Sequence, residues 1–127
     1  MNAEQWQQAI DLLETNHRLV KSDYELSWNL GWAYFRSERF SKAVAPLKNA
    51  VRLEPQRWGG HWALASAYLQ LNRLDEAIES SKSALELKDA TIARQTLALS
   101  YMKLGNIAAA EAVHRRGLEL QPLSAQR

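Results

Sequence analysis

Apolar residues along this chain return three, four and seven positions apart, with polar residues between them. This spacing is the period of an amphipathic α-helix, whose apolar residues line one face. The pattern is interrupted around residues 37–39, 71–73 and 104–106 by short stretches that carry Glu, Asn or Gly. It therefore predicts pairs of helices joined by tight turns. The apolar set of the first pair comprises Leu30, Tyr34, Phe40, Ala43 and Leu47.

The same pattern occurs three times at a period of about 34 residues, which predicts a solenoid of stacked helix pairs. In the first helix of each pair, a small residue follows a leucine and a tyrosine comes soon after. The three copies are Leu30-Gly31-Trp32-Ala33-Tyr34, Leu64-Ala65-Ser66-Ala67-Tyr68 and Leu97-Ala98-Leu99-Ser100-Tyr101. A second set follows each copy: Ala43, Leu47, Ala50 and Pro55, then Ala77, Ser81, Ala84 and Asp89, then Ala110, His114, Gly117 and Pro122. We expect the small residues Gly31, Ala65 and Ala98 to let the paired helices approach closely.

These motifs resemble the tetratricopeptide repeat, a helix-turn-helix unit of about 34 residues, over nearly the whole chain. The resemblance implies an all-α fold, a right-handed α-α superhelical solenoid of three helix pairs preceded by one N-terminal helix. It places repeat 1 at residues 24–57, repeat 2 at 58–90 and repeat 3 at 91–124, with 125–127 as a tail. Early in each repeat, where the family usually has a tryptophan, this chain has Ser27, His61 and Arg94.

Residues 1–23 precede the first repeat and are in phase with it. Trp6, Ala9 and Leu13 match the later positions of Phe40, Ala43 and Leu47. The segment from Asn2 to about Val20 is therefore predicted to be the second helix of a repeat whose first helix is missing. Asn2 and Gln5 supply an N-cap for this helix. Two origins stay open: a short natural protein capped by a lone helix, or a fragment of a longer array.

Backbone chemistry predicts special positions in the turns and in one helix. Asn72 and Gly105 tolerate a left-handed backbone in their turns, whereas Glu38 at the corresponding place would be strained. Pro46 falls inside the second helix of repeat 1, where proline removes a hydrogen-bond donor. It predicts a local kink or a late start of that helix.

The composition fits a single domain without obvious chemistry. The chain has 127 residues, 46% of them hydrophobic, and no cysteine, so disulfides and thiolate catalysis are excluded. His17, His61 and His114 have no carboxylate or histidine at i+3 or i+4, so we predict no metal site, no cofactor and no enzyme activity. Neither an apolar run of about 18 residues nor a signal pattern occurs. We therefore expect a cytoplasmic protein that does not insert into membranes.

The net charge of +2 conceals segments of alternating sign. Residues 1–23 and repeat 2 are acidic, whereas repeat 1 and the remainder are basic. Such alternation is typical of a solvated surface. No basic run with interleaved aromatic residues occurs, so nucleic acid is not a predicted partner.

The resemblance implies that the first helix of each repeat lines a concave groove. The lining of this groove is predicted to be Glu25, Trp28, Asn29, Trp32, Phe35 and Arg36 from repeat 1, Trp62, Ser66, Leu69 and Gln70 from repeat 2, and Gln95, Thr96, Leu99, Met102 and Lys103 from repeat 3. Its aromatic and aliphatic members would form an apolar patch too large for scattered surface residues.

The residues of this groove favour an apolar partner. Family members that clamp a chaperone's C-terminal carboxylate use Lys, Asn and Arg at positions that here carry Trp28, Trp32, Ala63, Ile92 and Thr96. A clamp of that kind is therefore not predicted. The groove suits an apolar peptide or amphipathic helix of another protein, with side chains inserted between aromatic walls and polar ends held by Asn29, Arg36, Gln70, Gln95 and Lys103.

Alternatives to partner binding stay open. The aromatic residues could pack between adjacent first helices, or the N-terminal helix or another copy of the chain could cover them. Self-association at the C-terminal end is also predicted, because uncovered repeat ends tend to stack. The candidates for apolar exposure there are Leu99, Ala109, Val113 and Leu120. The leading hypothesis is a scaffold or chaperone-like adaptor, and the alternative is a self-associating segment of a larger assembly.

Overall fold

The computed structural model describes residues 1–120, which form eight helices. The N-terminal segment contains α1 (Ala3–Thr15) and α2 (His17–Lys21). Three pairs follow: α3 (Tyr24–Arg36) with α4 (Phe40–Leu53), α5 (Trp58–Gln70) with α6 (Leu74–Leu87), and α7 (Thr91–Leu104) with α8 (Ile107–Leu120). The predicted all-α solenoid of three helix pairs is thereby confirmed. The expected end of repeat 3, including Pro122, lies outside the described residues.

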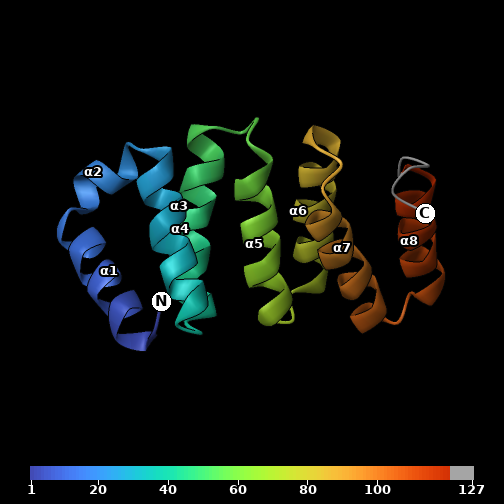
Figure 1. Ribbon diagram of the computed structural model, residues 1–127, viewed down its shortest axis with the longest axis horizontal. Coiled ribbons are helices and arrows are strands. Elements are labelled where there is room, and N and C mark those ends of the chain that lie inside the picture. Colours follow the sequence, from blue (N-terminus) through green and yellow to red (C-terminus); the bar gives the residue numbers. More distant parts are fainter. Residues whose placement is uncertain (121–127) are drawn as a thin grey trace.

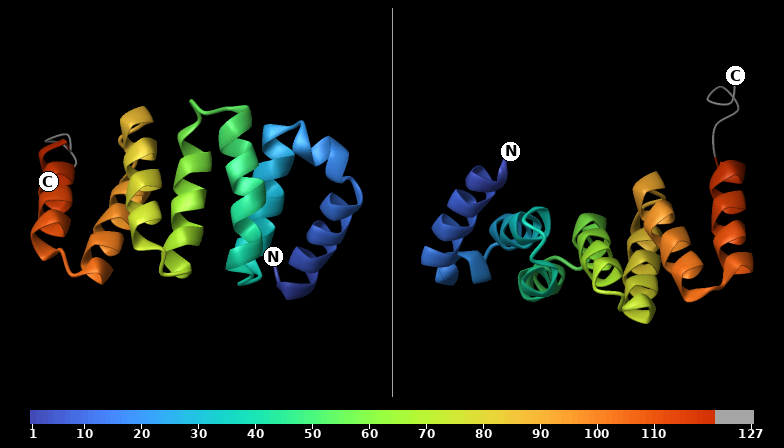
Figure 2. Two further views of the ribbon diagram at one scale, coloured as in Figure 1. Left: turned by 180° about the vertical axis from the view of Figure 1, so that it is seen from behind. Right: turned by 90° about the horizontal axis from the view of Figure 1, so that it is seen from below.

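The helices form a row that runs from α1 to α8, with the two terminal helices at opposite ends (Figure 1). From α2 onward, each helix packs mainly on its neighbours along the chain, whereas α1 packs mainly on α3. Successive first helices also pack on one another, α3 on α5 and α5 on α7. The turned views in Figure 2 show the same sequential arrangement. This packing places the first helices along one side of the solenoid.

The turns inside the three pairs share one backbone geometry. The amides of Arg39, Arg73 and Asn106 each donate to the carbonyl of the repeat tyrosine five residues earlier, at 2.8–2.9 Å. This bond reverses the chain when the preceding residue is left-handed. Glu38 and Asn72 have φ of 59°, and Gly105 has φ of 90°. The strain expected at Glu38 is thus present in the fold.

The N-terminal segment differs from the expected single helix because it breaks at Asn16 into α1 and α2. Asn16 occupies the repeat position of Ala50, Ala84 and Gly117, all of which are buried. A polar side chain is unfavourable in such a buried place, and Asn16 instead donates to the Leu12 carbonyl at 2.8 Å. The N-cap predicted at Asn2 is confirmed as a reciprocal capping box with Gln5.

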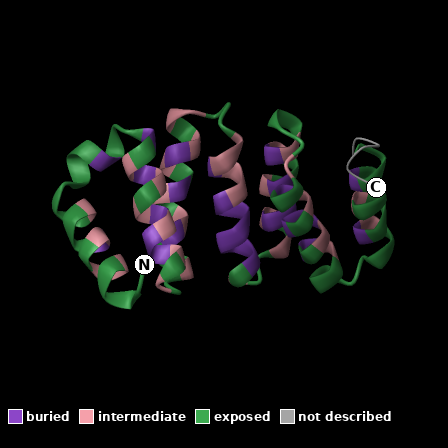
Figure 3. Cartoon of the chain, in the orientation of Figure 1, coloured by how far each residue is buried: buried purple, intermediate pink, exposed green. Residues whose placement is uncertain are grey.

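The core is continuous through the middle of the row, and buried residues are concentrated on α5 (Figure 3). Leu64, Ala65 and Tyr68 of α5 are buried, as are Ala77 and Ala84 of α6. Exposed residues predominate on α1 and α8 at the two ends. The N-terminal segment packs on α3, and within residues 1–120 no further repeat covers the outer side of α7 and α8.

Pro46 does not shift the start of the helix that contains it. The second helix begins at Phe40 and continues past Pro46 to Leu53, so the expected late start is wrong. Pro46 lies in the second turn, beyond the first amides that lack a partner in any helix. Pro46 therefore lowers the stability of the helix through the loss of one internal backbone N–H donor.

Candidate functional site

Aromatic side chains of α3 and α5 form one cluster at the predicted groove. Trp32 is its centre: its ring centroid lies 5.3 Å from Trp28, 5.0 Å from Phe35 and 5.3 Å from Trp62. The Trp28 indole donates to the Gly59 carbonyl at 3.2 Å, which ties α3 to the start of α5. We call Trp28, Trp32, Phe35 and Trp62 the aromatic row; all four side chains are half-buried.

The rings of the aromatic row cover one another's faces. Trp28 and Trp32 are stacked with an interplanar angle of 20°, and Trp32 and Phe35 with one of 7°. Face-to-face contact leaves no slot into which a third side chain could insert. The predicted insertion between aromatic walls is therefore wrong for α3. The row instead forms a continuous apolar wall that contacts the core on one side.

The structure separates the predicted lining into accessible and buried residues. Ser66 and Leu69 are 8% and 7% exposed and Thr96 is also buried, so these three do not form accessible groove surface. Leu69 belongs to the core, and the Ser66 hydroxyl donates to the Trp62 carbonyl at 3.0 Å. Eight other predicted residues are exposed: Glu25, Asn29, Arg36, Gln70, Gln95, Leu99, Met102 and Lys103.

The burial of Leu69 has a clear cause. Phe35, Leu69 and Met102 occupy the same repeat position. Leu69 is buried and Phe35 is half-buried, and their helices pack on the next first helix. Within residues 1–120 no further repeat follows α7 and α8, and Met102 is 53% exposed. The exposure of this position therefore increases toward the C-terminal end of the described residues.

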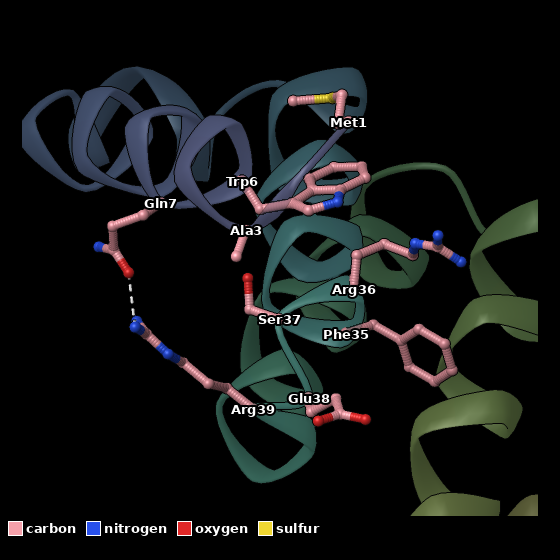
Figure 4. A pocket seen from close by; sticks show the side chains of 9 residues that line it. All are labelled: Met1, Ala3, Trp6, Gln7, Phe35, Arg36, Ser37, Glu38 and Arg39. Carbon is pink, nitrogen blue, oxygen red and sulfur yellow. Dashed lines mark hydrogen bonds between the residues drawn. The ribbon is translucent and has the colours of Figure 1, made fainter.

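A hollow of about 630 Å³ extends the row toward the N-terminal segment. Figure 4 shows Trp6 of α1 beside the last turn of α3, where Phe35 and Arg36 line the same hollow. The Arg36 guanidinium lies 5.9 Å from the Trp6 ring centroid, and Arg39 donates to the Gln7 side chain. Sequence reasoning assigned Trp6 only to helix packing. The signal that could have placed Trp6 near the groove is that it shares a repeat position with Phe40, which packs edge-on against Phe35.

The C-terminal pair exposes a second apolar surface. Leu99 and Leu120, both predicted, are 50% and 46% exposed, whereas Ala109 and Val113 are half-buried. A hollow of about 570 Å³ lies between α7 and α8, and its lining includes Met102, Ile107 and Leu118. Sequence reasoning missed Ile107 and Leu118, although they repeat the positions of Leu74 and Leu85.

One titratable group is clearly perturbed near the groove. Tyr34 is buried, and its hydroxyl donates to the Glu14 carboxylate. Burial, followed by this bond to Glu14, raises the pKa of Tyr34 to about 12. The bond holds α1 against α3 in the neutral form of Tyr34. Within residues 1–120, no group of His, Asp and Glu side chains is arranged to hold a metal ion, and no helix there could cross a membrane.

Solved structures of MamA share this fold. One MamA crystal structure has a TM-score of 0.86 at 24% identity, covering 96% of this chain and 72% of that chain. MamA MSR-1 has a TM-score of 0.82 at 26% identity, covering 91% and 67%. MamA from Desulfovibrio magneticus RS-1 has a TM-score of 0.85 at 19% identity, covering 92% and 67%. This chain thus spans about two thirds of the length of the MamA chains. A comparison with curated protein sequences found no match.

Family models give the sequence-level assignment. The tetratricopeptide repeat model matches residues 1–57 and 28–90, and a second tetratricopeptide repeat model matches residues 93–122. These matches cover the N-terminal segment and all three helix pairs. The chain therefore belongs to the tetratricopeptide repeat family.

Proposed function

We propose that this protein is an interaction scaffold that binds an apolar peptide or an amphipathic helix of another protein along the aromatic row. The half-buried aromatic row is the observation that carries this proposal. Its rings are packed on the core, so they enter a complex already ordered. Binding then loses little side-chain entropy, which favours such preformed aromatic surfaces as anchors.

The surroundings of the row support this class of partner. Exposed Asn29, Gln70 and Gln95 can hydrogen-bond a peptide backbone, and Arg36 and Lys103 can pair with acidic residues at its ends. Leu99 and Met102 continue the apolar surface onto α7. A partner with apolar anchors and polar flanks would thus match the groove along its length.

The experiment is a binding screen of labelled amphipathic and extended apolar peptides against the wild type and two groove variants. Trp32→Ala should weaken binding by more than about 1 kcal/mol. It also removes three ring contacts, each contributing about 0.5–1.5 kcal/mol, so its unfolding must be measured in parallel. Leu99→Asp changes an exposed side chain and should weaken binding without loss of stability.

Leu12→Ala supplies the matched control, because Leu12 is exposed on α1 and lies outside the groove. It should leave peptide binding unchanged. Equal peptide affinity in the wild type and in both groove variants would reject the proposal. Loss of binding only in Trp32→Ala, together with unfolding, would show that the aromatic row serves packing.

Self-association is the second candidate function, and the C-terminal surface favours it. Met102, Ile107 and Leu118 are exposed where the earlier repeats are covered by a following first helix. Uncovered repeat ends are expected to associate. Light scattering should show a mass above that of the monomer at a protein concentration of about 100 μM, and Ile107→Glu should restore the monomer. A wild type that stays monomeric would refute this candidate.

A further inference from the structure

A separate hollow lies between α2, α3 and α4 and shares no residue with the aromatic row. Its volume is about 460 Å³, and its floor includes Val20 of α2, Leu30 of α3, and Ala45 and Pro46 of α4. These side chains make the floor apolar. The hollow belongs to repeat 1 and the N-terminal segment, so the two later repeats do not contribute to it.

Repeat 3 has a hollow of about 510 Å³ at the equivalent place, and its lining includes both Asp89 and Arg94. The hollow of repeat 1 differs from it in the side chain at one repeat position and in the charges around it. Ser27, His61 and Arg94 occupy the same repeat position. His61 extends to the Pro55 carbonyl at 2.9 Å, and Arg94 pairs with Asp89. Both long side chains therefore reach the loop that precedes their helix. Ser27 is too short to do so, and no ion pair corresponding to that of Arg94 with Asp89 forms beside the hollow of repeat 1 among the described residues.

The leucine on the floor of this hollow is more exposed than its counterparts in the later repeats. Leu64 and Leu97 are 7% and 5% exposed, whereas Leu30 at the same repeat position is half-exposed. The Ser27 hydroxyl reaches only the Val20 carbonyl, at 2.6 Å. The apolar face of Leu30 thus remains open to the hollow.

The walls are fixed by a hydrogen-bond network rather than by mobile side chains. The Asn49 amide donates to the Lys21 carbonyl at 3.0 Å and to the hydroxyl of the fully buried Ser27 at 2.9 Å. The Arg52 guanidinium in turn donates to the Asn49 side-chain oxygen at 2.7 Å. This network joins the end of α2 to α3 and α4, so the hollow is preformed.

The rim carries only basic ionisable groups. His17, Lys21, Lys48 and Arg52 line the hollow, and no Asp or Glu does. Among the described residues, none of these four side chains forms an ion pair. Their positive field is therefore available to an incoming anion, and it attracts acidic partners at low ionic strength.

We propose that this hollow binds an acidic, leucine-containing segment of a partner protein. The apolar floor takes a leucine side chain, and the carboxylates on either side of that leucine pair with Lys21 and Lys48. Charge complementarity selects this occupant, because a neutral apolar segment would leave the basic rim unpaired and a basic segment would be repelled. The scaffold would then hold two partners at once, one on each site.

The test is fluorescence anisotropy with a labelled short peptide in which adjacent leucines are flanked by glutamates. The double variant Lys21→Glu/Lys48→Glu should weaken binding at least about tenfold, since two charge pairs become repulsive. Ala45→Phe should also weaken binding, because the added ring fills the floor. Raising the salt concentration should weaken wild-type binding in the same direction.

Matched controls come from repeat 2. Lys82 holds the repeat position of Lys48, and Glu79 holds that of Ala45, but neither lines the hollow. Lys82→Glu and Glu79→Phe should therefore leave the affinity within about twofold of the wild type.

Three results would overturn the proposal. The first is no binding of the acidic peptide to the wild type at low salt. The second is equal binding of a peptide with glutamines in place of the glutamates, which would indicate a purely apolar occupant. The third is salt-sensitive binding to phosphatidylserine vesicles but not to the peptide, which would assign the basic rim to a membrane surface. Urea unfolding of each variant verifies that the fold is intact.

Discussion

Gly31 lets α3 pack closely on Leu47 of α4. A Cβ atom added at Gly31 of α3 would lie 2.4 Å from Leu47 Cγ and 2.5 Å from Leu47 Cδ2 on α4. Carbon atoms in good contact lie about 3.5–4.0 Å apart. Leu47 is fully buried, so it has no free space into which to move. Gly31→Ala should therefore force the two helices apart or push Leu47 out of its rotamer.

Two opposing effects set the magnitude. Overpacking a well-filled core costs about 1–3 kcal/mol. Replacing glycine by alanine inside a helix contributes about 1 kcal/mol of stabilisation. Because the overlap here exceeds 1 Å on two atoms, we take the upper part of the overpacking range. The free energy of unfolding should then fall by about 1–2 kcal/mol.

Urea unfolding of a double-mutant cycle with Leu47→Ala tests the cause of this loss. Leu47→Ala alone should cost about 2–5 kcal/mol, because it leaves a cavity. In that background the new methyl group enters the cavity, so Gly31→Ala should be neutral or stabilising. A coupling energy of about 1–3 kcal/mol between the two positions is the expected signature of direct contact.

Gly59 supplies the matched control, because its added Cβ would meet only the Tyr24 hydroxyl at an ordinary 3.7 Å. Gly59→Ala should thus be neutral or stabilising by up to about 1 kcal/mol. The reasoning fails if Gly31→Ala behaves like Gly59→Ala. Such a result would mean that α3 and α4 do not meet in this register.

Further measurements test the turns, the core and the N-terminal contact. Glu38→Asn should raise the free energy of unfolding by about 0.5–1 kcal/mol, because asparagine tolerates the left-handed backbone better; an unchanged urea midpoint would contradict this. The Ser81 hydroxyl is buried without a partner among the described residues, so Ser81→Ala should add about 1 kcal/mol, and a loss of stability would show that a partner exists. The pKa of Tyr34 is raised from 10.0 to about 12 in the fold, so folding favours its neutral form. The stability contributed by this shift is present below pH 10 and falls as the pH rises toward 12. In urea titrations above pH 10, the wild type should therefore lose stability relative to Tyr34→Phe. Parallel pH profiles of the two proteins would refute this contribution.

The helix pairs were predictable because their signals are local. Three, four and seven residue spacings report a helical face within a single segment, and the repeat places each face in an equivalent environment. The left-handed turns followed from the same logic, since Glu38, Asn72 and Gly105 occupy one repeat position. The break at Asn16 was less visible, because a single polar residue stands where the later repeats have small ones.

The geometry of the aromatic row depends on information that the pattern does not contain. Trp28, Trp32 and Phe35 lie four and three residues apart on α3, which places them on one face. Whether their rings stand apart or stack depends on rotamers, and these are set by Trp62 from the next repeat and by the hydrogen bond to Gly59. The sequence therefore predicted the location of the row but not its closed faces.

Repeat equivalence itself explains why some predicted groove residues are buried. A position that faces the next repeat is covered in every unit except the last, so Phe35 and Leu69 pack while Met102 stays exposed. Equivalent hollows differ in their charges: the hollow beside Arg94 also has Asp89 in its lining, whereas the hollow beside Ser27 has only basic ionisable groups. The chemistry of a site in this solenoid therefore changes where equivalent repeat positions carry different residues. For this chain, a partner meets unfilled space in the hollow beside Ser27, in the hollow between Trp6 and Phe35, and at the surface around Met102, whereas the stacked rings of the aromatic row offer an apolar wall on which a partner can pack.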